Sequence, residues 1–243
     1  MIAFLTSSPG GCKTEDDGTH ISAPYTEEND FFPRLRAVWP EHARIVLIVA
    51  EPEDAVKNDE RKANLLESLA LSHLPYESVR MCDDRTADQL PQWMKDCNVL
   101  FLSGGHTLRQ NRFFHRLGLK SLLEDFDGVL VGTSGGSMNS ASVVYAQPEW
   151  EGDTTDPDYV LFPEGLGLTD VMILPHYYLY QETVLDGLRL IEDMAIPDSM
   201  GRTIHAFPDG TYLWLHDGKS EIVGDDFVIQ DGVITHYRNG VPV

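Results

Sequence analysis

Cysteine and basic residues are scarce in this sequence of 243 residues, and each shortage excludes a class of protein. The three cysteines, few and odd in number, argue against a disulfide scaffold and fit a reducing compartment, so we expect a cytoplasmic protein. Lysine and arginine total 18 against 39 aspartates and glutamates, which gives a formal net charge of −21. Such an acidic chain is unsuited to bind nucleic acid or an anionic membrane surface.

Long apolar runs are also missing. The cleanest one covers residues 45–50, far below the roughly 18 residues that a membrane span requires. The first residues lack the basic region of a signal peptide. Because neither a low-complexity linker nor an internal repeat divides the chain, we expect a single domain over residues 1–243. The oligomeric state stays open, and a homodimer is compatible with the sequence.

Short apolar runs alternate with amphipathic stretches along most of the chain. The predicted strands cover residues 2–6, 44–50, 77–81, 98–103, 128–133 and 171–174. The predicted helices cover residues 54–73, 86–95, 107–117, 120–125, 137–143 and 183–194. This alternation predicts an α/β fold, with a mainly parallel sheet flanked by helices on both faces. Asp-Gly pairs at 217–218 and 231–232 lie between apolar runs and predict β-hairpins near the C-terminus.

The sharpest motif is Gly-Thr-Ser-Gly-Gly at residues 132–136, a G-x-S-x-G pattern between a predicted strand and a predicted helix. A turn this tight strains the backbone of Ser134, and the flanking glycines leave room for it. The serine hydroxyl would then project at the carboxyl end of the strand, where it would act as a nucleophile. The alternative is a glycine-rich turn in which Ser134 only caps the helix.

A second glycine motif, Ser-Gly-Gly-His-Thr at residues 103–107, follows the preceding predicted strand. Acyl transfer needs at least two N–H donors for the oxyanion. Gly135, directly after the serine, is one candidate donor, and Gly105 or Gly104 in the neighbouring loop is the other. A tight turn between strand and helix explains the same glycines equally well.

A serine nucleophile needs a base, and the base needs an acid that orients it. Among nine histidines, His176 is the best candidate, because it follows a predicted strand at the edge where Ser134 should lie. The alternative is a structural histidine packed among tyrosines. Asp209 in a Phe-Pro-Asp-Gly segment is the candidate acid, although Pro-Asp-Gly is also an ordinary turn. Its rivals lie in the acidic segment 148–163: Glu149, Glu151 and Asp153.

Metal and cofactor motifs are weak or missing. No pair of cysteines or histidines has the spacing of zinc ligands, and the aspartates at 153–158 do not match a calcium loop. Gly-Gly-Cys-Lys-Thr at residues 10–14 lacks the upstream glycine of a phosphate-binding loop. We therefore expect a site without metal or cofactor, next to an acidic loop or lid over residues 148–163.

Three motifs together resemble those of the dipeptidase E and cyanophycinase family of serine peptidases. They are a strand that ends in Ser-Gly-Gly-x-Thr, a strand that ends in G-x-S-x-G-x-x-N, and a later Pro-His-Tyr. The likeness runs over residues 44–215. It implies a class I glutamine amidotransferase-like α/β fold, with Ser134 as the nucleophile and His176 as the base.

The resemblance also assigns the other members of the site. It implies Gly105 and Gly135 as the oxyanion donors, and Asp209 as the third member of the triad. A second assignment within the family favours an acid in the loop after the nucleophile helix. In this sequence that position falls near Glu149 or Glu151.

Some residues depart from the pattern of the family. Gly135 stands where alanine is usual, and His106 stands where asparagine is frequent. Dipeptidase E holds an N-terminal aspartate of its substrate with an arginine shortly after the base, and residues 177–186 contain no arginine. Arg109 and Arg112, just after the glycine loop, are possible substitutes. We therefore expect His106 and Arg109 to bind substrate.

Three functions are compatible with these residues. We favour a serine peptidase, similar to a dipeptidase or exopeptidase, that cleaves short peptides through a Ser-His-Asp triad. A cyanophycinase-like enzyme would use the same chemistry on β-linked aspartyl-arginine peptides, and an acidic pocket would favour those substrates. A non-catalytic, amidotransferase-like domain that binds a small ligand or a partner would show no triad geometry.

Overall fold

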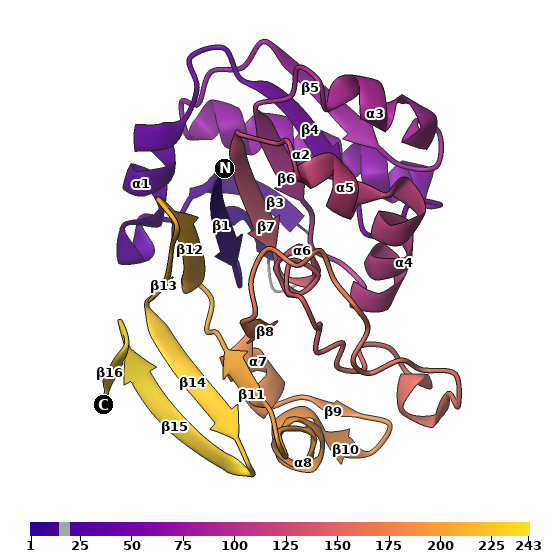
Figure 1. Ribbon diagram of the computed structural model, residues 1–243, viewed down its shortest axis with the longest axis vertical. Helices are drawn as coiled ribbons and strands as arrows, with labels where there is room; N and C mark the ends of the chain where they lie inside the picture. The colour runs from indigo at the N-terminus through magenta and orange to yellow at the C-terminus, as the bar shows by residue number, and fades with distance from the viewer. Residues whose placement is uncertain (15–19) are drawn as a thin grey trace.

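The computed structural model describes residues 1–14 and 20–243, and its main body is a seven-stranded sheet (Figure 1). In chain order these strands are β1 (Ile2–Thr6), β4 (Arg44–Ile48), β5 (Ser78–Cys82), β6 (Val99–Leu102), β7 (Val129–Thr133), β12 (Tyr212–His216) and β13 (Lys219–Val223). Their order across the sheet is β13-β12-β1-β7-β6-β4-β5. Strands β1, β7, β6, β4 and β5 run parallel to one another. Strands β12 and β13 extend the sheet beyond β1 and are antiparallel.

Strands β4, β6 and β7 are buried at nearly every position, which explains their continuous apolar sequences. A parallel strand needs such a sequence because elements cover both of its faces. The flanking α-helices are α1 (Phe31–Val38), α2 (Ala55–Leu71), α3 (Leu90–Trp93), α4 (Thr107–Leu117) and α5 (Leu119–Leu123). Within the described residues, no helix is both long and apolar enough to cross a bilayer.

A second sheet of five strands lies beside the main one (Figure 1). Its strands are β8 (Met172–Leu174), β11 (Thr203–Ala206), β14 (Asp225–Gln230), β15 (Val233–Arg238) and β16 (Val241–Pro242). The Asp-Gly pairs at 217–218 and 231–232 have positive φ at both residues, the geometry of a two-residue hairpin turn. The predicted hairpins are therefore confirmed, but the first extends the main sheet and the second belongs to this smaller sheet.

Two predicted helices are wrong. Residues 183–194 form the short hairpin β9 (Val184–Leu185) and β10 (Leu188–Arg189), followed by the π-helix Leu190–Ala195. The cause is the pair Asp186 and Gly187, whose φ values of 51° and 83° make another hairpin turn inside an apparently helical pattern.

The helix expected over residues 137–143 is shortened to α6 (Gly135–Met138). The following residues instead pair with the chain at 164–169, through the bridges Ala141–Thr169 and Val143–Glu164. Backbone groups that bond to a distant segment in this way are not available to continue a helix.

Several elements were not expected from the sequence. A hairpin of β2 (Gly10–Thr14) and β3 (His20–Tyr25) packs against α2, and α1 follows it.

The predicted helix 86–95 is a 3₁₀ turn (Ala87–Gln89) followed by α3. The remaining short helices are Glu28–Asp30, Asp153–Thr155, α7 (Tyr177–Gln181) and α8 (Ile196–Asp198).

The turn between β7 and α6 packs tightly against the end of β6. A Cβ atom on Gly136 would lie only 2.3 Å from the carbonyl oxygen of Leu102. We expect Gly136→Ala to lower the free energy of unfolding by about 3 kcal/mol or more. The added methyl group would collide with the Leu102 carbonyl, which can move only if strand β6 shifts. The measurement is urea unfolding followed by circular dichroism.

The control for this variant is Gly118→Ala, at a helix end with open space around the added methyl group. Its φ of 61° is left-handed, so we expect a cost of about 1 kcal/mol. Equal losses in the two variants would contradict the steric explanation.

Candidate active site

Ser134 lies at the sharp turn between β7 and α6, as the G-x-S-x-G motif predicts. Its backbone angles are φ 49° and ψ −117°, a strained conformation for any residue other than glycine. The neighbouring strand β1 holds this turn in place, because the Ser134 N–H donates to the carbonyl oxygen of Thr6 at 3.0 Å. The side chain therefore leaves the sheet at the carboxyl end of β7.

A continuous chain of hydrogen bonds joins Ser134, His176 and Asp209. The Ser134 Oγ lies 3.1 Å from Nε2 of His176, and Nδ1 of the same ring lies 2.7 Å from Oδ1 of Asp209. A carboxylate only accepts, so the proton of a neutral imidazole must sit on Nδ1. Nε2 is then left as the acceptor for the Ser134 hydroxyl.

These three residues come from separate parts of the fold. His176 follows β8 of the smaller sheet, with left-handed φ and ψ of 57° and 37°. Asp209 lies in the turn between β11 and β12, where Gly210 has a φ of 87°. The backbone of Phe207 joins the two loops, since its N–H donates to Leu174 and its carbonyl accepts from Tyr177.

Ser7, at the end of β1, connects the histidine to the acid. Its hydroxyl accepts the backbone N–H of His176 at 2.8 Å and donates to Oδ1 of Asp209 at 2.7 Å. Sequence reasoning missed this residue. The available signal was its position directly after the predicted strand 2–6, at the same sheet edge as Ser134.

The surroundings keep Asp209 ionised. Partial desolvation works to raise the pKa of Asp209, but the hydrogen bond and positive charge of His176 and the bond from Ser7 outweigh it. The pKa of Asp209 therefore lies below its ordinary value. An ionised carboxylate at this position stabilises a protonated His176 ring.

The two glycine loops touch through their backbones. A Cβ atom on Gly135 would lie 2.5 Å from the carbonyl oxygen of Gly105, and one on Gly104 would lie 3.4 Å from Cβ of Ser134. This contact leaves no room for a side chain at Gly135. Within residues 1–14 and 20–243, the N–H groups of Gly105 and Gly135 have no hydrogen-bond partner.

Glu149 lies against the glycine loop and makes no hydrogen bond to His176 in the described structure. Its carboxylate accepts from the backbone N–H of Thr107 at 2.7 Å and from the Thr107 hydroxyl at 2.9 Å. Burial raises the pKa of Glu149 to about 7, against the lowering effect of the Thr107 bonds and with help from the charges of Asp153 and Glu51. Among the acids proposed from the sequence, the one bonded to His176 is Asp209.

His106 and Arg109 attach the acidic segment to the glycine loop. His106 is only 6% exposed, its Nε2 lies 3.3 Å from Asp153, and its ring packs against Trp150. Burial lowers the pKa of His106 more than Asp153 raises it. Arg109 pairs with Glu53 at 2.7 Å and lies over the Trp150 ring. Both side chains, expected to bind substrate, are thus engaged within the protein.

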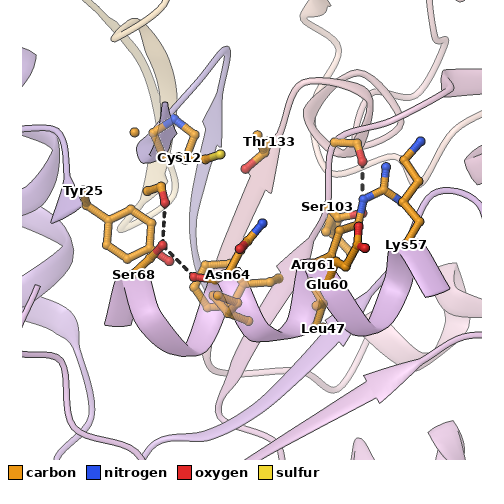
Figure 2. Close-up of a pocket in the computed structure, with 17 residues that line it drawn as sticks. Cys12, Tyr25, Leu47, Lys57, Glu60, Arg61, Asn64, Ser68, Ser103 and Thr133 are labelled. Atoms are coloured by element: carbon orange, nitrogen blue, oxygen red, sulfur yellow. Dashed lines mark hydrogen bonds between the residues drawn. The ribbon is translucent and has the colours of Figure 1, made fainter. Parts of the chain in front are cut away.

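A cavity of about 600 Å³ opens beside Thr133, the residue that precedes the serine (Figure 2). The end of β6, helix α2 and the first hairpin enclose it, and Thr133 and Gly104 bring its wall to the serine turn. Within residues 1–14 and 20–243, no group of three or more His, Cys, Asp or Glu side chains is placed to hold a metal ion.

No protein-family model matches this chain, and no curated protein sequence does. Among solved structures, the chain is similar to a protein of Listeria monocytogenes EGD-e described as a "Putative Peptidase E Protein". The match has a TM-score of 0.59 at 14% sequence identity, and it covers 91% of this chain and 96% of the other. The likeness confirms the predicted fold class, a mainly parallel α/β sheet with C-terminal antiparallel strands.

Replacing Glu149 with glutamine tests the buried carboxyl group. A carboxyl group whose pKa is raised in the folded protein, here from 4.5 to about 7, destabilises the fold as the pH rises between these values. We expect the wild type to lose about 3 kcal/mol of stability relative to Glu149→Gln between pH 4.5 and pH 7.5. Urea unfolding of both proteins across this range measures the difference, and parallel pH profiles would refute it.

Proposed function

We propose that this chain is a serine-type peptidase that hydrolyses short peptides, with Ser134 as nucleophile, His176 as base and Asp209 as the orienting acid. The observation that carries the proposal is the unbroken hydrogen-bonded chain from the Ser134 hydroxyl to the Asp209 carboxylate. Two further features support it. They are the strained turn under the serine and the fold shared with a protein described as a peptidase E.

In the first half of the reaction, the Ser134 Oγ attacks the carbonyl carbon of the scissile bond while Nε2 of His176 takes the hydroxyl proton. The imidazolium ion that forms is stabilised by the ionised Asp209 through Nδ1–H. The ring then gives its proton to the leaving amine as the carbon–nitrogen bond breaks. A water molecule, deprotonated by the same ring, attacks the acyl-enzyme and releases the second product.

The oxyanion of each tetrahedral intermediate needs N–H donors close to Ser134. We assign this role to the amides of Gly135 and Gly105, which have no other partner among the described residues. Each such donor contributes roughly 3 kcal/mol to catalysis in other enzymes. The packing of Gly105 against Gly135 supports a hole assembled from the two loops.

The alternatives are less well supported by the residues beside the serine. Arginine-bearing substrates of the cyanophycinase type would need an acidic pocket, but the cavity is lined by Lys57 and Arg61 as well as Glu60. A non-catalytic domain has no need for a serine and a histidine 3.1 Å apart in strained backbone conformations.

Removing the Ser134 hydroxyl tests the proposal directly. We expect Ser134→Ala to lower the turnover of a dipeptide library by several orders of magnitude, because the nucleophile is lost. We also expect a fluorophosphonate probe to label the wild type and not the variant. Unchanged turnover in Ser134→Ala, with no labelling of the wild type, would favour the non-catalytic alternative.

A paired comparison tests which acid orients the histidine. We expect Asp209→Asn to lower kcat by on the order of 10⁴-fold, because the amide favours the wrong imidazole tautomer. Glu149→Gln should lose much less, since Glu149 bonds to Thr107 and not to His176. The measurement is kcat for one peptide substrate at pH 7.5, and a larger loss in Glu149→Gln would transfer the role to Glu149.

A further inference from the structure

The cavity borders the candidate active site through Thr133 and Gly104, which lie next to Ser134. It is lined by residues 9–12 of the first hairpin, one face of α2, the end of β6 and Thr133. Gly104, which borders the cavity, lies directly against Ser134. Its volume of about 600 Å³ is within the range of small-molecule sites. A group attached to a carbonyl at Ser134 therefore has a cavity to enter.

The inner wall of this cavity is apolar. Tyr25, Leu47 and Phe101 line it, and each is less than 7% exposed. The rings of Tyr25 and Phe101 stack with an interplanar angle of 13°. Transfer of apolar surface from water to such a wall is favourable, so an apolar side chain that displaces water from the cavity is stabilised there.

Hydrogen bonds between the first hairpin and α2 connect two walls of the cavity. The Ser68 hydroxyl donates to the carbonyl oxygen of Gly11 at 2.5 Å, which ties the helix to the hairpin. On the same side, Ser22 donates to the Asn64 side chain at 3.2 Å. In Figure 2, Asn64 lies between Ser68 and Arg61 along α2, and its side chain is directed toward Thr133.

The charges at the rim are already balanced. Arg61 and Lys57 lie 2.5 Å and 3.6 Å from the buried Glu51 carboxylate, and Glu60 adds a second negative charge at the rim. Burial works to raise the pKa of Glu51, but the His106 amide, Arg61 and Lys57 outweigh it and hold the group ionised. Both cations of the rim thus face the Glu51 carboxylate, and Arg61 is the closer of the two.

Two other arginines near the site, Arg109 and Arg189, pair with acids of the protein. Arg109 pairs with Glu53, and Arg189, the first arginine after the base histidine, makes two hydrogen bonds to Asp193. Neither of these two arginines is therefore free to bind an acidic group of a substrate. The apolar inner wall is therefore the feature of the cavity from which we infer selectivity.

We propose that this cavity is the specificity pocket of the site and accepts a large apolar or aromatic side chain next to the scissile bond. The inference rests on the proposed peptidase function and adds the substrate class. An aspartyl side chain against the same wall would lose its hydration, and Arg61 and Lys57 already face Glu51. A phenylalanyl side chain would gain the apolar wall formed by Tyr25, Leu47 and Phe101.

The test compares five dipeptides: Phe-Ala, Ala-Phe, Asp-Ala, Ala-Asp and Ala-Ala. For the wild type, we expect kcat/KM for one of the two phenylalanine peptides to exceed that for Ala-Ala by about tenfold or more, and to exceed its aspartate counterpart. Asn64→Trp, which fills the cavity, should abolish this ratio. Ala63→Trp places the same ring on the exposed neighbouring position of α2 and should retain it.

Binding to the Ser134→Ala protein, measured by calorimetry with the same peptides, separates the two proposals. A preference for phenylalanine that Asn64→Trp removes, without turnover by the wild type, would support the pocket and overturn the peptidase function. Preferred hydrolysis of the aspartate peptides, or a phenylalanine advantage that survives Asn64→Trp, would overturn the pocket and leave the peptidase function standing. Thermal unfolding of both tryptophan variants checks that they are folded.

Discussion

The hydrogen bonds of one small side chain, Ser7, hold the candidate site together. Ser134 belongs to the seven-stranded sheet and His176 leaves the five-stranded sheet, so no strand pairing sets the distance between them. The Ser7 hydroxyl accepts from the His176 backbone and donates to Asp209, both within 2.8 Å. A hydroxyl both donates and accepts, so Ser7 holds the loops of His176 and Asp209 against the end of β1. Strand β1 in turn pairs with β7, which carries Ser134 at its end.

Close backbone contact is the second constraint on this region. Gly105 touches Gly135, and Gly136 packs on the end of β6 through Leu102. Side chains at these positions would force the loops apart and move the amides away from the serine. The same glycine-rich turns that allow the strained backbone of Ser134 thus also bring two separate loops into contact, and the large cavity opens directly beside them.

Two carboxylates near the site have opposite environments. Asp209 is 61% exposed and receives hydrogen bonds from His176 and Ser7, so it stays charged. Glu149 is mostly buried against Thr107, and desolvation raises its pKa to about 7. Acids whose surroundings separate their pKa values in this way serve different roles. Here the charged one faces the imidazole, and the buried one fastens the acidic segment to the start of α4.

The sequence by itself determined the parallel strands, the turn at Ser134 and the hairpins at the Asp-Gly pairs, because each depends on local pattern or backbone preference. It also singled out His176 and Asp209 from their positions at strand and turn ends, but left Glu149, Glu151 and Asp153 as rivals of Asp209. Only the tertiary structure decided which acid meets the histidine, placed Ser7 between them and turned His106 inward. Those outcomes depend on how two sheets pack, and a contact between residues 169 positions apart leaves no periodic trace in the chain.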